Sequence, residues 1–220
     1  MLDFFVKVQD GDYSLTIASY IILGLITALL VVVALFLTKK KDNKTFSTKQ
    51  LVFCGVAMAL AIVTSFIKVY EMPMGGSITL LSMAFICLIG YLYGAKVSIL
   101  VAIAYGLLQL IIKPDIYHPI QLILDYPVAF GALGLSGFFW KSKNGLIKGY
   151  LVGIIGRFLI ASISGYIFFG AYAPEGWNPI LYSLVYNGSY IFAEGLITIV
   201  LLCLPPVKAA FEQVKKMAHN

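Results

Sequence analysis

A single carboxylate, Asp125, stands beside Tyr126 in an otherwise apolar run of the sequence. An ionised side chain at the depth of the membrane hydrocarbon costs about 3 kcal/mol or more, so it usually faces a protein interior, a partner or a ligand. Aromatic faces attract cations and stack on flat rings, and a neighbouring carboxylate supplies the counter-charge. This combination predicts a binding pocket for a small aromatic cation.

Further polar and aromatic residues occur at similar depth, near the same ends of the predicted helices. The additional candidates for ligand binding are Tyr182, Asn187, Tyr190, Trp177 and His118. Because Tyr182 and Asn187 are five residues apart, they lie roughly 140° apart on a helix, and the spacing alone does not place both in one pocket. Two alternatives stay open: the aromatic residues can form an interfacial belt, and His118, beside a proline, can be a local hydrogen-bonding residue.

Gly75, Gly76 and Ser77 lie in a predicted outer loop. No strand is predicted before them and no G-K-S/T follows, so they do not match a nucleotide-binding loop. Two glycines permit unusual backbone angles, which a gate over an outward-facing pocket requires. The alternative is an ordinary tight turn between two helices.

Two charged residues, Arg157 and Glu194, fall near the middle of their apolar segments. Either charge is costly in a bilayer without a partner, so we expect the two to form a buried ion pair with a structural role. Ala57 and Ala61, four residues apart, form a small-residue face that permits close helix approach, either inside the bundle or against a partner protein. The three cysteines lack the spacing typical of a metal site, and no metal is expected.

Membrane-spanning helices are the elements that must position these residues. Hydrophobic residues make up 60% of the 220 residues and charged residues 12%, which lies outside the range of soluble domains. We therefore expect an all-α integral membrane protein, since helices satisfy their own backbone groups within the bilayer. Seven apolar segments are predicted to be helical: about Ser14–Thr38, Leu51–Tyr70, Ile78–Tyr93, Val97–Ile112, Pro119–Phe139, Leu146–Phe169 and Pro179–Leu204.

The distribution of lysines predicts the topology. Twelve of the sixteen basic residues fall on the cytoplasmic side if the N-terminus lies outside and the C-terminus is cytoplasmic, as the positive-inside rule requires. These residues are Lys39, Lys40, Lys41, Lys44, Lys49, Lys96, Lys141, Lys143, Lys148, Lys208, Lys215 and Lys216. The expected organisation is an extra N-terminal helix and basic hinge over residues 1–48, a six-helix membrane domain over residues 49–207, and a cytoplasmic tail over residues 208–220.

Four motifs, in order, resemble the thiamine-binding S-components (ThiT type) of energy-coupling factor (ECF) vitamin transporters, and the resemblance spans about residues 49–204. The motifs are Met74–Leu80 (MGGSITL), His118–Tyr126 (HPIQLILDY), Ile163–Gly170 (ISGYIFFG) and Tyr172–Asn187, which begins YAPEG and ends YSLVYN. The resemblance implies a six-helix bundle in a prokaryotic plasma membrane, to which the first helix of this chain is an addition.

The resemblance also implies roles for particular residues. Asp125 stands where the family carries an acidic residue that meets the cationic vitamin, and Tyr126, Tyr182 and Asn187 match substrate-contacting positions. The loop of residues 75–77 would gate the pocket.

Partners and function are implied by the same resemblance. The face of Ala57 and Ala61 would contact a transmembrane coupling subunit, and two separate ATPase subunits would hydrolyse ATP, in keeping with the lack of a Walker motif here. The expected function is the capture of thiamine from outside by a transport subunit that is not an enzyme, needs no cofactor and binds no nucleic acid.

Two positions depart from the family pattern. Ala161 stands where members commonly carry a substrate-contacting histidine, and Phe169 stands where they carry a stacking tryptophan. Phe169 can still stack, whereas losing one hydrogen bond to a buried ligand costs about 1–3 kcal/mol unless water or another side chain replaces it. The alternative functions are an S-component for a thiamine precursor or analogue, an intramembrane enzyme that uses Asp125, Glu194 or His118, and a seven-helix receptor.

Overall fold

The computed structural model describes residues 6–9, 12–18, 21 and 46–219. Most of the expected first membrane helix and all of the basic run from Lys39 to Lys44 lie outside the described residues. Strands β1 (Val6–Gln9) and β2 (Asp12–Leu15) pair antiparallel near the N-terminus. Because β2 includes Ser14, the helix predicted from about that residue begins a few residues later, and Ile17 and Ala18 are helical.

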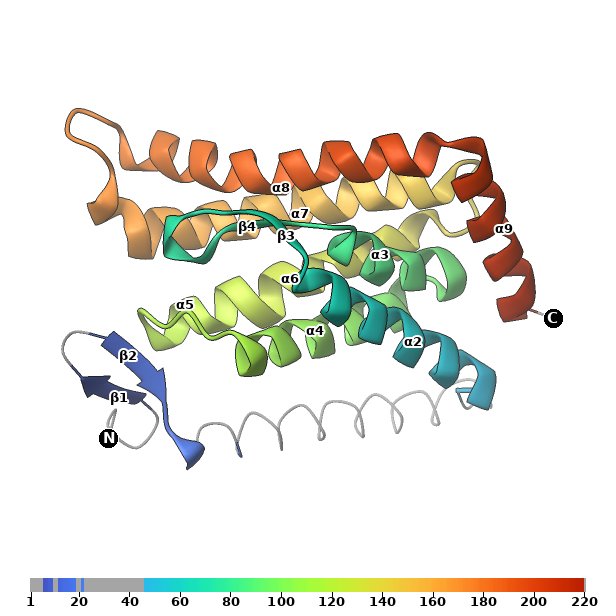
Figure 1. Ribbon diagram of the computed structural model, residues 1–220, viewed down its shortest axis with the longest axis horizontal. Helices are drawn as coiled ribbons and strands as arrows, with labels where there is room; N and C mark the ends of the chain where they lie inside the picture. Colours follow the sequence, from blue (N-terminus) through green and yellow to red (C-terminus); the bar gives the residue numbers. More distant parts are fainter. Residues whose placement is uncertain (1–5, 10–11, 19–20, 22–45, 220) are drawn as a thin grey trace.

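The rest of the chain is a bundle of apolar helices, which confirms the expected all-α membrane architecture (Figure 1). Within the described residues, five segments are long and apolar enough to cross a membrane. They are α2 (Thr48–Ser65), α4 (Ala95–Ile112), the segment Pro119–Phe139, α7 (Gly145–Phe169) with the short helix η5 (Gly170–Tyr172), and α8 (Pro179–Cys203). A sixth apolar helix, α3 (Ser82–Tyr93), is shorter.

A hairpin interrupts the predicted helices between α2 and α3. It consists of strand β3 (Lys68–Glu71), the 3₁₀ turn η2 (Pro73–Gly75) and strand β4 (Ser77–Thr79), and the two strands pair antiparallel. The predictions of a helix that continues to Tyr70 and of another that begins at Ile78 were therefore wrong at these ends. The two strands are only three and four residues long, and the glycine pair between them allows the chain to reverse direction.

The segment from Pro119 to Phe139 is not one regular helix. Its parts are α5 (Pro119–Ile123), the π-helical turn η3 (Leu124–Val128), α6 (Ala129–Gly131) and the 3₁₀ helix η4 (Ala132–Phe139). Pro127 lies inside the π-helical turn, and a proline removes one backbone donor from the helical ladder. Wider turns of this kind often occur at functional sites. Here the turn contains Asp125 and Tyr126.

A last helix, α9 (Pro205–His219), closes one end of the bundle, where the sequence predicted only a tail from residue 208 (Figure 1). Its Ala218 is buried in a cluster that includes Leu88 and Leu92 of α3. Lys215 of α9 donates a hydrogen bond to the carbonyl of Trp140 at 2.6 Å, and burial lowers the pKa of Lys215. The apolar residues of α9 that face α3 therefore pack this helix across the end of the bundle.

The small-residue face of α2 is inside the bundle. Ala61 has no exposed surface and Ala57 is 4% exposed, and both belong to buried clusters that include residues of α3. The prediction that these alanines contact a partner subunit was therefore wrong, because close packing against α3 covers them. The residues that α2 presents outward, such as Val52, Val56 and Val63, are more than half exposed.

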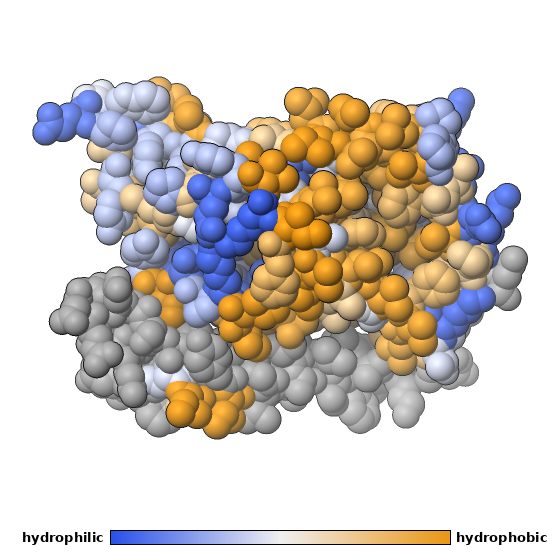
Figure 2. Space-filling model, in the orientation of Figure 1, coloured by the Kyte–Doolittle hydropathy of each residue, from blue (hydrophilic) through white to orange (hydrophobic). Residues whose placement is uncertain are grey.

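The two ends of the bundle differ in character. α9 and the start of α2 lie at one end, whereas the β3–β4 hairpin, the start of α5 and the loop between α7 and α8 lie at the other (Figure 1). Figure 2 shows apolar residues over much of the face between these ends and a hydrophilic group near the hairpin. This arrangement matches a protein embedded in a bilayer.

Candidate ligand-binding site

A cavity of about 150 Å³ lies toward the hairpin end of the bundle. Its walls come from the hairpin, the end of α4, the segment after Pro119, α7 and α8. Concave sites of this kind, with apolar walls and a few polar groups, are typical of small-molecule binding.

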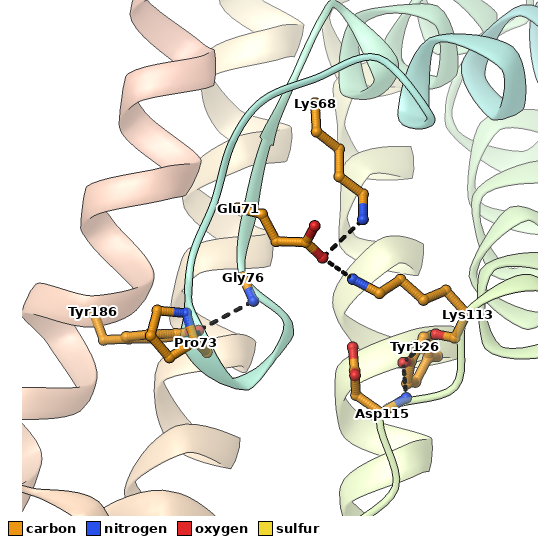
Figure 3. Close-up of polar contacts among 8 residues, drawn as sticks. All are labelled: Lys68, Glu71, Pro73, Gly76, Lys113, Asp115, Tyr126 and Tyr186. Carbon is orange, nitrogen blue, oxygen red and sulfur yellow. Dashed lines mark hydrogen bonds and ion pairs between the residues drawn. The ribbon is translucent and has the colours of Figure 1, made fainter. Parts of the chain in front are cut away.

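The cover is the hairpin of residues 68–79, which we call the lid. Its tip is tied to α8 because the hydroxyl of Tyr186 accepts a hydrogen bond from the amide of Gly76 at 3.1 Å and donates one to the carbonyl of Pro73. Figure 3 shows Tyr186 reaching the lid from one side. Gly75 adopts a φ of +88°, which L side chains rarely adopt, so the tight tip depends on a glycine there.

An exposed ion-pair network fastens the side of the lid. The Glu71 carboxylate contacts Lys68 at 2.8 Å, and it also contacts Lys113 at the C-terminal end of α4 (Figure 3). Hydrogen bonds from Lys113 and Lys68 lower the pKa of Glu71 to about 2. The lid is thus attached to α8 at its tip and to α4 along its side.

Neutralising this network is expected to loosen the lid slightly. A carboxylate whose pKa is depressed in the fold stabilises the fold above its unfolded pKa, and the contribution disappears as the pH falls through the folded value. Glu71→Gln should therefore speed hydrogen exchange of residues 68–79 at pH 5–7, and the difference from the unaltered chain should vanish toward pH 2. High salt should reduce the difference in exchange rate between the two chains, because salt screens exposed charges. Equal exchange in both chains at pH 6, with Glu212→Gln as the control, would contradict a fastening role.

The floor of the cavity carries Asp125, and Gln121 fixes it. The Gln121 side chain is 1% exposed, and its amide donates to Asp125 Oδ2 at 2.6 Å and to the carbonyl of Asp115 at 3.1 Å. The Tyr126 hydroxyl accepts from the Asp115 amide and donates to the Lys113 carbonyl, both at 2.8 Å. These contacts hold the loop after α4 beside the carboxylate.

One face of α8 forms an aromatic wall. Tyr182, Tyr186 and Tyr190 are spaced four residues apart, and successive ring centres lie 6.1 and 5.9 Å apart. Asn187 is buried on the same helix, where the Tyr190 hydroxyl donates to its Oδ1 at 2.9 Å. The structure thus brings Tyr182 and Asn187 into one cavity, a question that their spacing left open.

Most of the ligand-binding residues predicted from the sequence line the cavity. They are Asp125, Tyr126, Phe169, Tyr182, Asn187 and Tyr190, together with Gly75, Gly76 and Ser77 of the lid. Two others lie outside its lining. His118 accepts a hydrogen bond from the Ile120 amide at 3.2 Å at the start of α5, which is the local role left open above, and Trp177 is 47% exposed in the loop before α8.

The expected ion pair between Arg157 and Glu194 was wrong. Among the described residues, the ion pairs within 4.0 Å are those of Glu71 with Lys68 and Lys113. Arg157 instead lies over the ring of Phe130, 4.1 Å from its centre, and lines the cavity. Glu194 is 2% exposed and accepts hydrogen bonds from uncharged donors.

Several cavity residues were not predicted from the sequence as ligand-binding residues, among them Gln109, Lys113, Asp115 and Arg157. With Asp125, the charged lining comprises two carboxylates and two cations, so the site offers charge complementarity without a large net charge. Burial raises the pKa of Asp115, while Lys113 acts in the opposite direction. Rings, a buried amide and charges of both signs equip the site to hold a flat polar molecule.

The chain is similar to proteins of one known family. A family model described as "Thiamine transporter protein (Thia_YuaJ)" matches residues 51–213. The thiamine transporter ThiT of Bacillus subtilis (strain 168) is 33% identical over 178 residues, which cover 74% of this chain and 92% of the relative. ThiT of Lacticaseibacillus paracasei is 35% identical over 115 residues, 44% of this chain and 57% of the relative.

A solved structure is also similar. ThiT from Listeria monocytogenes is 28% identical to this chain, and the two superpose with a TM-score of 0.60 over 71% of this chain and 94% of that one. The similarity therefore covers nearly the whole of the solved protein.

Proposed function

This chain belongs to the thiamine transporter protein family, and we propose that it is the substrate-binding membrane subunit of an uptake transporter, capturing thiamine from outside in the cavity beneath the lid. It is a multi-pass membrane protein whose relatives are named as transporters, not enzymes. The subunit binds and releases its ligand without altering it. The plasma membrane of a prokaryote is the proposed location.

One observation carries the assignment of the site: groups suited to an aromatic cation come from distant parts of the chain and line a single cavity. Asp125 supplies the negative charge, Phe169 and Tyr182 supply aromatic faces, and Asn187 supplies a buried amide. Thiamine carries a cationic thiazolium ring and a flat aminopyrimidine ring. Aromatic faces favour both rings, and a carboxylate stabilises the cation.

The energy for uptake is proposed to come from partners: a transmembrane coupling subunit and two ATPase subunits of the energy-coupling factor type. The sequence contains no Walker A motif. Since Ala57 and Ala61 are buried, a coupling subunit that docks on α2 would meet its outward residues, such as Val56. Co-expression tests this: uptake of labelled thiamine by cells should require all of the subunits, and uptake by this chain alone would contradict it.

Titration of thiamine into the purified chain tests the site directly. Calorimetry should give submicromolar binding, and an uncharged thiazole analogue should bind much more weakly because it lacks the cation that Asp125 attracts. Calorimetry suits this chain better than tryptophan emission, since Trp177 lies outside the cavity lining. No heat at millimolar thiamine would refute the specificity.

A thiamine precursor or analogue is a second candidate, favoured by the lining at Ala161. This residue is 8% exposed and lines the cavity, where its methyl group neither donates nor accepts a hydrogen bond. A ligand with an apolar group at that position would lose no hydrogen bond, and so no binding free energy, by facing Ala161. Competition between thiamine and pyrimidine or thiazole relatives separates the candidates: displacement of bound thiamine at lower concentrations than thiamine itself requires would favour the relative.

A further inference from the structure

Glu194 is a buried carboxylate that the proposed site does not use. It is 2% exposed, and both of its oxygens accept hydrogen bonds from the region where the lid joins α3. The Thr79 hydroxyl and amide donate to Oε2 at 2.6 and 3.0 Å. The Ser82 hydroxyl and the Met83 amide donate to Oε1 at 3.2 and 3.3 Å. The Ser82 and Thr79 hydroxyls also lie 2.6 Å apart, so two hydroxyls and two backbone amides form one hydrogen-bond network around the Glu194 carboxyl group.

These contacts make Glu194 the cap of another helix. Leu81, at the N-cap position of α3, makes no hydrogen bond from its side chain and adopts a left-handed conformation with φ of 65°. The first amides of a helix require acceptors, and a negative charge there is favourable. Glu194 supplies both to α3 from α8. The strained junction at Leu81 is thus held by a residue that is distant in sequence.

The same face of α8 also carries the wall of the cavity. Tyr182, Tyr186, Tyr190 and Glu194 follow one another at intervals of four residues, which places them along one side of the helix. Tyr186 holds the tip of the lid, and Glu194 holds its base at Thr79. Only Ile78 and Ser77 separate Thr79 from Gly76, so a shift of the base is passed directly to the tip.

We infer that Glu194 is a positioning residue for ligand binding: it anchors the base of the lid to α8, and this anchor keeps the tip in register with the tyrosines that line the cavity. This inference rests on the proposed function, in which the lid covers bound thiamine. Glu194 then has a role in ligand binding in addition to its contribution to the stability of the fold. When the anchor is lost, the lid should open more often and bound thiamine should leave faster, while the rings and Asp125 remain in place.

The test uses the full purified chain and three single variants. Glu194→Gln replaces one acceptor oxygen with an amide that points its own N–H groups at donors, and Thr79→Val removes one donor to Oε2 while the backbone bond remains. Thr198→Val is the matched control, because Thr198 is fully buried one turn further along α8 and is not among the donors to Glu194. The readouts are the dissociation rate of thiamine and the hydrogen exchange of residues 68–79 without ligand.

We expect Glu194→Gln to speed thiamine dissociation about tenfold or more, at the strength of a hydrogen bond to a charged group. Thr79→Val should have a smaller effect in the same direction, and the double variant should be no faster than Glu194→Gln, because both act on one contact. Exchange should rise in residues 68–79 but not in α7. Thr198→Val should stay within twofold of the unaltered chain.

Dissociation within twofold of the unaltered chain in both Glu194→Gln and Thr79→Val would overturn the inference. So would exchange that rises equally in the lid and in α7, since that result indicates general destabilisation. If Glu194→Gln does not fold, Thr79→Val decides by the same criteria. If the unaltered chain does not bind thiamine, the proposed function fails, and the exchange of the lid without ligand still decides whether Glu194 anchors it.

Discussion

Asp125→Asn is expected to weaken thiamine binding about 100-fold. The substitution keeps the size of the side chain and an oxygen that can accept from Gln121, which donates at 2.6 Å, so the floor of the cavity should keep its shape. What it removes is the negative charge that the proposed site offers to a cationic ring. Removing one partner of a buried charge pair costs about 2–5 kcal/mol, and about 2.7 kcal/mol corresponds to 100-fold in affinity.

The measurement is calorimetric titration of both chains with thiamine and with an uncharged thiazole analogue. The variant should lose most of its preference for the cation, while its affinity for the neutral analogue should change little. Glu175→Gln, in the loop before α8, is the control that changes a charge outside the cavity lining. If Asp125→Asn binds thiamine within threefold of the unaltered chain, another group, such as Asp115, supplies the counter-charge.

The long apolar segments were predictable because their composition alone determines that they cross a membrane. The segments around α4, α7 and α8 agree with the predicted ranges to within a few residues at each end. Asp125 was predictable for the same reason: a carboxylate is costly in such a segment, so its position indicates a use. The sequence thus predicted that Asp125 faces a cavity and that its segment spans the membrane, but not the π-helical turn in which it lies.

The pairing of charged residues was not predictable, because hydropathy gives the depth of a residue but not the direction in which it points. Arg157 and Glu194 lie at mid-span, yet Glu194 accepts hydrogen bonds from the start of α3, which its own N-cap residue Leu81 does not cap. Backbone amides at a helix end satisfy a carboxylate as a cation does. The sequence does not reveal that α3 begins at that depth, since the three-residue strand before it, Ser77–Thr79, is too short to be distinguished from the end of a helix.

The two strands of the lid and the helix α9 were missed for related reasons, although the gate at Gly75–Ser77 was predicted. Strands of three or four residues have no periodicity that can be distinguished from an apolar helix end, and β4 has three residues. α9 has mixed polarity, which is typical of an exposed tail, and the sequence does not show that it covers the end of the bundle. His118 and Trp177 were placed in the cavity because they flank its loops, but sequence proximity to a loop does not fix which way a side chain faces.

Gly76→Val is expected to weaken thiamine binding about 30-fold, mainly through faster dissociation. A Cβ at Gly76 would lie 2.7 Å from the Tyr186 hydroxyl and 2.9 Å from a ring carbon of Tyr190, so the closed lid has no space for a side chain there. The backbone itself accepts valine, with φ of −60° and ψ of 134°. Overpacking costs about 1–3 kcal/mol, or about 5- to 140-fold in affinity, and the lid can relieve it by lifting.

The control is Gly55→Val on α2, where an added Cβ meets no atom within 4 Å, and it should leave binding unchanged. Stopped-flow measurements separate the two rate constants. An unchanged association rate with faster dissociation is expected, because an open lid admits the ligand but no longer retains it. If Gly76→Val slows association and leaves dissociation alone, the glycine serves entry rather than closure, and the contact of the lid with Tyr186 is not what retains thiamine.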